Sequence, residues 1–438
     1  MQYIPNLIFA LALAVGLGFF VMNIRKLLRN IKLGKDVNRT DKKPERLKNM
    51  MMIALGQSKM VKRPFSGFLH VIVYVGFVII NIEVLEIVID GIAGTHRIFQ
   101  GIIGDSFYAF LIGTFEIFAA LVFIAVILFW TRRNLANIKR FMSAEIKGWP
   151  KSDANYIIYF EMILMTLFIV MNATDAPFQE AGIGNPISQF IAPLFDAFSP
   201  EALHIVERTA WWIHILGILT FLNYLYYSKH LHILLAFPNT YFANLNPKGQ
   251  FDNLESVTNE VKLMMDPDAD PYAMPAEGAE ETVPEKFGAS DVADLNWVQL
   301  LNSYTCTECG RCTSACPANL TGKKLSPRKI MMDTRDRLEE VGRNIDTNKG
   351  TFVDDGKQLL NDYISPEELW ACTSCNACVE ECPVNIDPLS IIMDMRRYLV
   401  MEESAAPQEL NMMMTNIENN GAPWPYNQQD RLNWANEE

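Results

Sequence analysis

The first 240 residues contain five long runs of apolar residues. A membrane-spanning helix needs about 20 consecutive, mostly apolar residues, and the runs approach or exceed this length. The first run is not expected to be a cleaved signal peptide, because no basic segment precedes it and no small-residue cleavage site follows it. We therefore predict an all-α membrane bundle of five transmembrane helices, at Ile4–Met22, Phe65–Ile89, Phe107–Trp130, Tyr156–Met171 and Ala202–Phe237.

Lysine and arginine are distributed unevenly among the loops between these runs. Arg25–Arg63 contains thirteen Lys/Arg against three Asp/Glu, and Thr131–Lys151 contains six more. Between Ser152 and Glu207 there is no Lys or Arg. The positive-inside rule therefore places the two basic loops in the cytoplasm. It predicts a multi-pass protein of the bacterial inner membrane with its N-terminus outside and its C-terminal half in the cytoplasm.

The histidines indicate a cofactor in the membrane half. His70 begins the second run, His96 lies in the next external loop, and His214 and His232 lie in the fifth run. Eighteen residues separate the last two, which is five helical turns or about 27 Å along one helix face. Because imidazole is a common axial ligand of haem iron, we expect His70 and His232 to bind a haem b at cytoplasmic depth. His214 and His96 are candidates for a second haem, and one haem alone or purely interfacial histidines are the alternatives.

Ionisable residues also fall within the apolar runs. Charge inside a membrane is costly and indicates a function by default, such as proton transfer to a quinone. The alternative for those near the external surface is simple pairing or solvation. Glu116 and Glu161 are the deeper candidates, and the others are Glu83, Glu86, Glu207 and Arg208.

The composition changes after residue 240. Residues 241–295 are rich in acidic residues and proline, which predicts an extended linker with one short helix near Leu254–Met265. The whole chain has 38 Lys and Arg against 50 Asp and Glu, a net charge of −12. This balance argues against a nucleic-acid partner, which requires a basic face.

The strongest motif in the chain is a duplicated run of four cysteines that ends in Cys-Pro. Its spacing, C-x2-C-x2-C-x3-C-P, is that of bacterial ferredoxins with two [4Fe–4S] clusters, in which the fourth cysteine of each run binds the other cluster. Structural zinc is the alternative, but zinc sites use two CxxC pairs. We expect one cluster on Cys306, Cys309, Cys312 and Cys382, and the other on Cys372, Cys375, Cys378 and Cys316.

The cysteine runs lie in a predicted, mainly α-helical domain over 296–405. Ser326 followed by Pro327 is typical of a helix start, and a final helix is expected at Leu389–Met401. Residues 406–438 contain Trp424, Tyr426 and Trp434. Because aromatic residues are common at interface hot spots, we interpret this tail as a docking segment, with a loose terminus as the alternative.

Both halves resemble parts of known families. The segment from His214 to His232 and the Gly67–His70 run are similar to the haem-ligand helices of the respiratory nitrate reductase gamma subunit and of the heterodisulfide reductase membrane subunit. In the nitrate reductase pattern a second histidine follows ten residues after His70, and this chain has Ile80 there. The cysteine half resembles the C subunits of heterodisulfide reductase and anaerobic glycerol-3-phosphate dehydrogenase. It also resembles membrane-anchored oxidoreductases that pass electrons from electron-transfer flavoprotein to menaquinone.

These resemblances imply an electron-transfer subunit rather than an enzyme that converts a substrate itself. Electrons would pass between a cytoplasmic redox partner and membrane quinone, with menaquinone as the expected quinone. The expected partners are electron-transfer flavoprotein and a separate iron–sulfur subunit with CCG motifs, since no cysteine follows Cys382. Two alternatives remain: the quinol-dependent electron-delivery half of a heterodisulfide reductase-like complex, and a membrane-anchored ferredoxin without haem.

Overall fold

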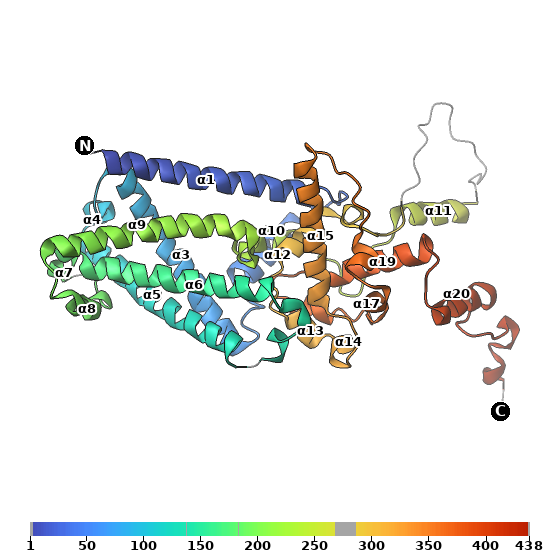
Figure 1. Cartoon of the computed structure of the whole chain (residues 1–438). Helices are drawn as coiled ribbons and strands as arrows, with labels where there is room; N and C mark the ends of the chain where they lie inside the picture. The colour runs from blue at the N-terminus through green and yellow to red at the C-terminus, as the bar shows by residue number, and fades with distance from the viewer. Residues whose placement is uncertain (1–2, 137, 183, 268–285, 437–438) are drawn as a thin grey trace.

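Five helices in the first half are long and apolar enough to cross a membrane. A computed structural model describes residues 3–136, 138–182, 184–267 and 286–436. The five helices lie side by side in a bundle, which Figure 1 shows on the left. They confirm the predicted spans, and they are α1 (Ile4–Ile31), α3 (Pro64–Ala93), α5 (Asp105–Asn134), α6 (Trp149–Thr174) and α9 (Pro200–Tyr224).

Local sequence signals set the ends of these helices. Pro64 and Pro200 open α3 and α9 at a position where the missing N–H is not needed, and the Ser199 side chain accepts a hydrogen bond from the Ala202 N–H. Helix α3 ends at Gly94, whose φ of 75° is the left-handed conformation that favours glycine. Inside the bundle α3 packs on α5, α5 on α6, and α6 on α9. The fully buried side chains there are mostly large and apolar, and they include Phe9, Ile112, Phe115, Phe168 and Ile215.

The fifth span is not one continuous helix, which corrects the sequence-based expectation. Helix α9 ends at Tyr224, and the next helix, α10, spans His232–Tyr241. Between them the chain forms two short 3₁₀ turns around Ser228, which is extended at φ −117° and ψ 144°. The Ser228 hydroxyl accepts a hydrogen bond from the His230 N–H, which stabilises the break. His214 and His232 therefore do not share one helix face.

Short helices cover the two ends of the bundle. Helices α4 (Ile98–Ile103), α7 (Ala176–Ala181) and α8 (Ser188–Ile191) lie at one end (Figure 1). Helices α2 (Lys43–Met50) and α10 pack together at the other end. The remaining short helical turns are Met51–Leu55, Lys139–Phe141, Ala144–Ile146, Ala192–Phe195, Val292–Asp294, Gln428–Asp430 and Asn433–Ala435.

The cysteine half folds into a helical domain at the α10 end of the bundle (Figure 1). Ser326 is the N-cap of α15 (Pro327–Thr347) and Pro327 is its first residue, as predicted. The final helix, expected at Leu389–Met401, is α19 (Pro388–Met401). The other helices are α12 (Trp297–Thr305), α13 (Arg311–Ala315), α14 (Pro317–Leu320), α15 (Pro327–Thr347), α16 (Leu359–Asp362), α17 (Pro366–Trp370) and α18 (Ala377–Glu381).

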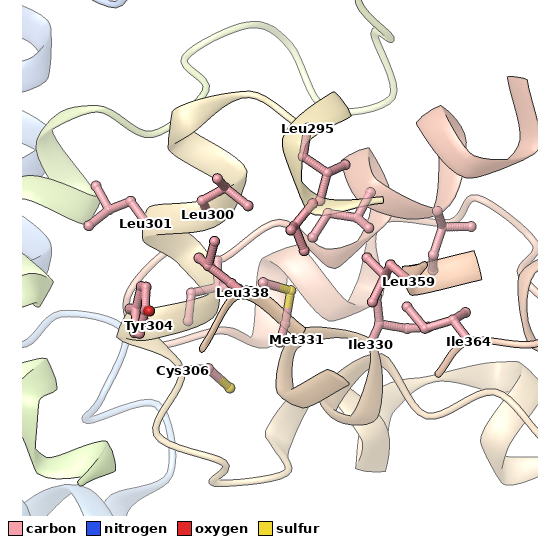
Figure 2. Close-up of a cluster of buried hydrophobic side chains, with 14 of the residues drawn as sticks. Leu295, Leu300, Leu301, Tyr304, Cys306, Ile330, Met331, Leu338, Leu359 and Ile364 are labelled. Atoms are coloured by element: carbon pink, nitrogen blue, oxygen red, sulfur yellow. The ribbon is translucent and has the colours of Figure 1, made fainter. Parts of the chain in front are cut away.

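One apolar core holds this domain together, and it places the first cysteine. Figure 2 shows Leu300, Leu338 and Met331 packed from α12 and α15, with Cys306 at the edge of the cluster. Ala289, Val292 and Leu295 are also buried in this core, so it includes residues that precede 296. The short helix expected near Leu254–Met265 is α11 (Glu255–Met265), and α20 (Gln408–Asn420) extends away from the domain (Figure 1).

The helical domain is joined to the bundle by contacts from several membrane segments. The Lys35 N–H donates to Leu295 O at 2.8 Å, and the Trp297 N–H donates to Lys35 O at 3.0 Å. Beside them the Asn30 amide donates to the Tyr304 hydroxyl at 3.0 Å, in a buried position. On the other side Arg328 forms a 2.7 Å ion pair with Glu145. These contacts fix the cysteine domain against one end of the bundle.

Candidate electron-transfer centres

Five cysteines, drawn from both runs, line one small cavity in the helical domain. Cys306, Cys309 and Cys312 line it from the first run, and Cys378 and Cys382 line it from the second. The chain turns sharply on either side of Cys309, since Glu308 has a φ of 54° and Gly310 a φ of 72°. The structure therefore brings Cys382 to the first run, as crossed ligation requires.

The second group is arranged in the reciprocal way. Burial and the nearby Asp387 raise the pKa of Cys378, and the neighbouring Cys372 and Cys316 thiols contribute to the same shift. Burial likewise raises the pKa of Cys372, with contributions from Cys316 and Cys375. Cys316 thus lies among the cysteines of the second run. The ligand sets themselves stay a prediction.

The donor set fits [4Fe–4S] clusters. The Ser374 N–H donates to Cys372 Sγ at 3.4 Å, and the Ile386 N–H donates to Cys382 Sγ at 3.3 Å. Such N–H···S contacts stabilise thiolates bound to iron. Among the described residues, no three His, Cys, Asp or Glu side chains converge to hold a single metal ion. A cubane does not need such convergence, because each thiolate binds a different iron.

The two groups differ in their access to solvent. Cys375 is exposed, whereas Cys306, Cys316, Cys378 and Cys382 are buried. The second group is therefore the one with a thiol that is open to solvent. Each group also contains two buried cysteines, so the difference between the groups is confined to Cys375.

His70 and His232 face each other at the end of the bundle that carries the cysteine domain. Their ring centroids are 6.5 Å apart with an angle of 42° between the planes. The His232 Nδ1 atom lies 3.0 Å from Lys229 O, which leaves Nε2 free to bind a ligand. The Nδ1 atom of His70 is buried and has no hydrogen-bond partner among the described residues. His230 is adjacent, with its ring 5.5 Å from that of His232.

The other two candidate histidines are in different surroundings. His214 is buried against Phe168, with ring centroids 6.2 Å apart. His96 Nε2 lies 3.3 Å from Asp175, and the His96 side chain is 52% exposed. The predicted pairing of His214 with His96 therefore gains no support from the structure.

A buried ionic cluster between the two sets of ligands was not anticipated from the sequence. The Lys229 ammonium pairs with Glu308, which lies between Cys306 and Cys309, and it also donates to Pro150 O at 2.7 Å. Arg335 reaches the other oxygen of Glu308 at 2.9 Å. Burial alone would raise the pKa of Glu308, but Lys229 and Arg335 outweigh it and lower that pKa. The signal in the sequence was a charged residue close to a predicted ligand in each segment: Glu308 next to Cys309, and Lys229 three residues before His232.

We expect Lys229→Met to destabilise the docked cysteine domain. The change leaves the buried Glu308 with one cation instead of two, and breaking a buried pair costs about 3 kcal/mol or more. The temperature at which the cluster absorbance is lost should fall by several degrees. The matched control is Lys324→Met, because Lys324 and its partner Glu367 are both about two-thirds exposed and such pairs contribute under about 1 kcal/mol. Equal losses in both variants would contradict a structural role for the buried pair.

These features define a class of protein. Five apolar helices joined to a helical domain with two four-cysteine runs make the chain a multi-pass, membrane-anchored iron–sulfur electron-transfer protein. Residues 305–386 match the family described as the 4Fe-4S dicluster domain. The chain therefore carries two [4Fe–4S] clusters on its eight cysteines. This match confirms the predicted fold class and the iron–sulfur cofactors.

Particular relatives share most of the chain. It is similar to the probable iron-sulfur-binding oxidoreductase FadF of Bacillus subtilis, with 29% identity over 98% of this chain and 61% of that protein. It is also similar to the EtfAB:quinone oxidoreductase of Syntrophomonas wolfei, with 25% identity over 92% of this chain and 55% of that protein. The chain thus spans less than two thirds of the length of either relative. No solved structure shows a significant match to it.

The predicted likeness of the cysteine half to the C subunits of heterodisulfide reductases is supported. The C subunit of the ferredoxin/F(420)H(2)-dependent CoB-CoM heterodisulfide reductase of Methanosarcina acetivorans is 32% identical over 25% of this chain and 53% of that protein. The likeness of the membrane half to the nitrate reductase gamma subunit stays a prediction.

Proposed function

We propose that this chain carries electrons between a soluble redox partner and a quinone in the membrane, through two [4Fe–4S] clusters and one haem b. The observation that carries this proposal is the meeting of the first cysteine group and the His70–His232 pair at one end of the bundle. Substrate chemistry, apart from that of the quinone, belongs to the partner. The similarity to an EtfAB:quinone oxidoreductase supports both the soluble partner and the quinone in this proposal.

Contacts join the cysteine loop to both histidine-bearing segments. Arg311 lies between Cys309 and Cys312, and it donates to Lys59 O at 3.0 Å and to Met60 O at 3.1 Å, in the segment that leads into α3 and His70. The Lys229–Glu308 pair makes the corresponding contact to the segment that leads into His232. Both histidines are thereby held next to the loop that binds the first cluster. Electron transfer requires a short distance between redox centres, and these contacts hold the ligands of the two proposed centres close together.

The geometry of the histidine pair fits axial ligation. With a metal–nitrogen bond of about 2 Å, two imidazoles on opposite sides of one iron have ring centroids about 6 Å apart. The observed separation is 6.5 Å. The contact from His232 Nδ1 to Lys229 O is the kind of hydrogen bond that orients a ligating imidazole. A haem b held here would supply a one-electron carrier, and the second haem at His214 stays a prediction without a partner.

The exposed cysteine marks the place where electrons enter. Cys375 is the exposed member of the second group, so a soluble protein can approach that cluster directly. Electron-transfer flavoprotein is the proposed partner, by analogy with the name of the Syntrophomonas relative. A separate CCG-type subunit is proposed to dock on the tail, where Trp424, Tyr426 and Trp434 are exposed.

A second candidate function uses the same centres in the opposite direction. The similarity to the C subunit of a heterodisulfide reductase favours a chain that takes electrons from quinol and delivers them to a thiol–disulfide reductase partner. The two functions differ in partner and direction, and identification of the co-purifying protein separates them.

We place the cysteine domain in the cytoplasm, on the evidence of the basic loops. Protease added to inverted membrane vesicles should then cleave the exposed segment that follows α20, whereas protease added to intact spheroplasts should leave it uncut. Cleavage in spheroplasts would reverse the proposed orientation. The acidic segment 268–285, which the sequence predicts to be a linker, lies outside the described residues.

The test of the function is reoxidation of the centres by quinone. We expect the anaerobically purified protein to show iron–sulfur and b-type absorbance changes on reduction with dithionite. A menaquinone analogue should then reoxidise both sets of bands, because the route ends at the quinone. Ferricyanide is the control oxidant, since it accepts electrons without a quinone site. Reoxidation by ferricyanide but not by the analogue would favour a membrane-anchored ferredoxin without quinone reactivity.

A further inference from the structure

A buried polar network fills the end of the bundle opposite the cysteine domain. Arg97 follows α3 and donates to Asp175 at 2.9 Å, to Asn172 at 3.0 Å and to the Tyr108 hydroxyl at 3.3 Å. These partners come from α6, from the residue after it and from α5, so the network ties three spans together. Its size is unusual for the inside of a membrane bundle, where polar groups are costly and indicate function.

Three carboxylates in this network are fully supplied with hydrogen-bond donors. Glu86 accepts from the Phe99 N–H at 2.8 Å and from the Tyr108 hydroxyl at 3.0 Å. Glu116 accepts from Asn172 at 3.0 Å, and its other oxygen accepts from the N–H groups of residues 187 and 188 at 2.8 and 2.9 Å. Asp175 is paired with Arg97. The polar oxygens of these three side chains therefore have partners within the protein.

Asp175 also connects the network to water. It lies just beyond the α6 span, and burial alone would raise its pKa, but the hydrogen bond from His96 and the charge of Arg97 lower that pKa to about 2. His96 is half exposed and binds Asp175 at 3.3 Å. The network therefore reaches the aqueous face of the protein that is remote from the cysteine domain.

Glu83 is the exception among the carboxyl groups. Its side chain is 3% exposed, and its Oε2 atom is buried with no hydrogen-bond partner among the described residues. It lies one helical turn before Glu86, and it interacts electrostatically with Arg97, Glu86 and Glu116. A buried carboxylate without donors is unfavourable, so the neutral form with its proton is the stable one. Glu83 is therefore the carboxyl group in this network whose buried oxygen is not committed to a donor among the described residues, which leaves it open to take up and release a proton.

We infer that Glu83, which lies toward the end of the membrane domain remote from the cysteine domain, is the proton-exchanging group for the quinone chemistry of this chain. This inference rests on the proposed function. Reduction of a quinone consumes two electrons and two protons and yields one quinol. The electrons arrive from the clusters, and the protons come from the opposite aqueous face through the network around Arg97 and His96. Because electrons and protons enter from opposite sides, the reaction moves charge across the membrane.

The direction of proton uptake can be measured in sealed vesicles. Phosphatidylcholine vesicles would contain the full chain, menaquinone-4 and trapped pyranine, with valinomycin and potassium to remove the membrane potential. Titanium(III) citrate outside does not cross the bilayer, so it reduces only molecules whose cysteine domain faces outward. Two Ti(III) are oxidised to Ti(IV) for each quinone reduced. We expect the trapped pyranine to report alkalinisation of the interior, and protein-free vesicles give the background.

Variants at Glu83 test its role. Glu83→Gln should lower the rate of interior alkalinisation at least about tenfold, in the range usual for loss of a proton-transfer group. Glu83→Asp, which keeps a carboxyl, should recover part of the rate. The matched control is Glu180→Gln, an exposed carboxylate in α7 at the same end, which should behave as the unmodified chain does. Unchanged cluster absorbance checks the fold, and Glu83→Met replaces Glu83→Gln if the amide prevents folding.

The possible failures are distinguishable. No quinone reduction by the unmodified chain overturns the proposed function, and the role of Glu83 with it. Quinone reduction with proton uptake only from the outer medium, or full activity of both Glu83→Gln and Glu83→Met, overturns the role of Glu83 alone. The competing group is Glu161, the other carboxyl in the spans without a hydrogen bond or ion pair among the described residues. Loss of activity in Glu161→Gln but not in Glu83→Gln would assign the role to Glu161.

Discussion

Replacement of Cys382 by alanine should remove the cluster that is built mainly by the first cysteine run. Cys382 lines the same cavity as Cys306, Cys309 and Cys312, so its loss leaves that cubane with three protein ligands. Non-haem iron should fall from about eight to about four per chain. Because this cluster lies next to the His70–His232 pair, electrons should still enter the remaining cluster but should no longer reach the haem.

Two single variants show which cluster has been lost. Under crossed ligation the electron paramagnetic resonance spectrum of reduced Cys382→Ala should match that of Cys309→Ala. If each run bound its own cluster, the spectrum of Cys382→Ala would instead match that of Cys375→Ala. Cys316→Ala is the reciprocal case and should resemble Cys375→Ala. Spectra that matched only between variants of the same run would contradict crossed ligation.

Replacement of either His70 or His232 by alanine should abolish the b-type absorbance. In the proposed arrangement each imidazole would supply one of the two protein ligands of the haem, so its loss would leave the haem held by one protein ligand only. The non-haem iron should remain at about eight atoms per chain, because the cysteines are untouched. Quinone-dependent reoxidation of the clusters should fall to background in the same variants.

Other histidines serve as controls for this prediction. His204 is exposed near the remote end of α9, so His204→Ala should keep the full spectrum. His230 is the stricter comparison, because its ring lies 5.5 Å from that of His232. A b-type spectrum that survived in His70→Ala but disappeared in His230→Ala would show that the ligand pair is wrong.

Features that depend on short stretches of sequence could be predicted. The five spans follow from apolar length, and a membrane helix satisfies its own backbone hydrogen bonds, so no distant contact is needed to define it. The start of α15 follows from Ser326 and Pro327, which act within one turn. The two [4Fe–4S] clusters follow from cysteine spacing, because the three closely spaced thiolates of each run come from one segment of seven residues.

The fifth span shows the limit of such reasoning. Its apolar pattern continues past Tyr224, yet the helix stops there and restarts at His232. Asp153 of α6 accepts hydrogen bonds from the Tyr224 hydroxyl at 2.6 Å and from the Lys229 N–H at 3.2 Å. A residue more than 70 positions away thus holds the break, and no local pattern contains it.

The sequence by itself therefore determined the membrane spans, the helical dicluster domain and the candidate ligands. Only the tertiary structure decided how they are connected: the Lys229–Glu308 pair between the ligand segments, the meeting of His70 with His232, and the isolation of Glu83 among carboxylates that have donors. The physical reason is that burial and pairing are properties of residues brought together from distant parts of the chain. The residues that flank a charged side chain in the sequence are the same whether or not the fold places a partner beside that side chain.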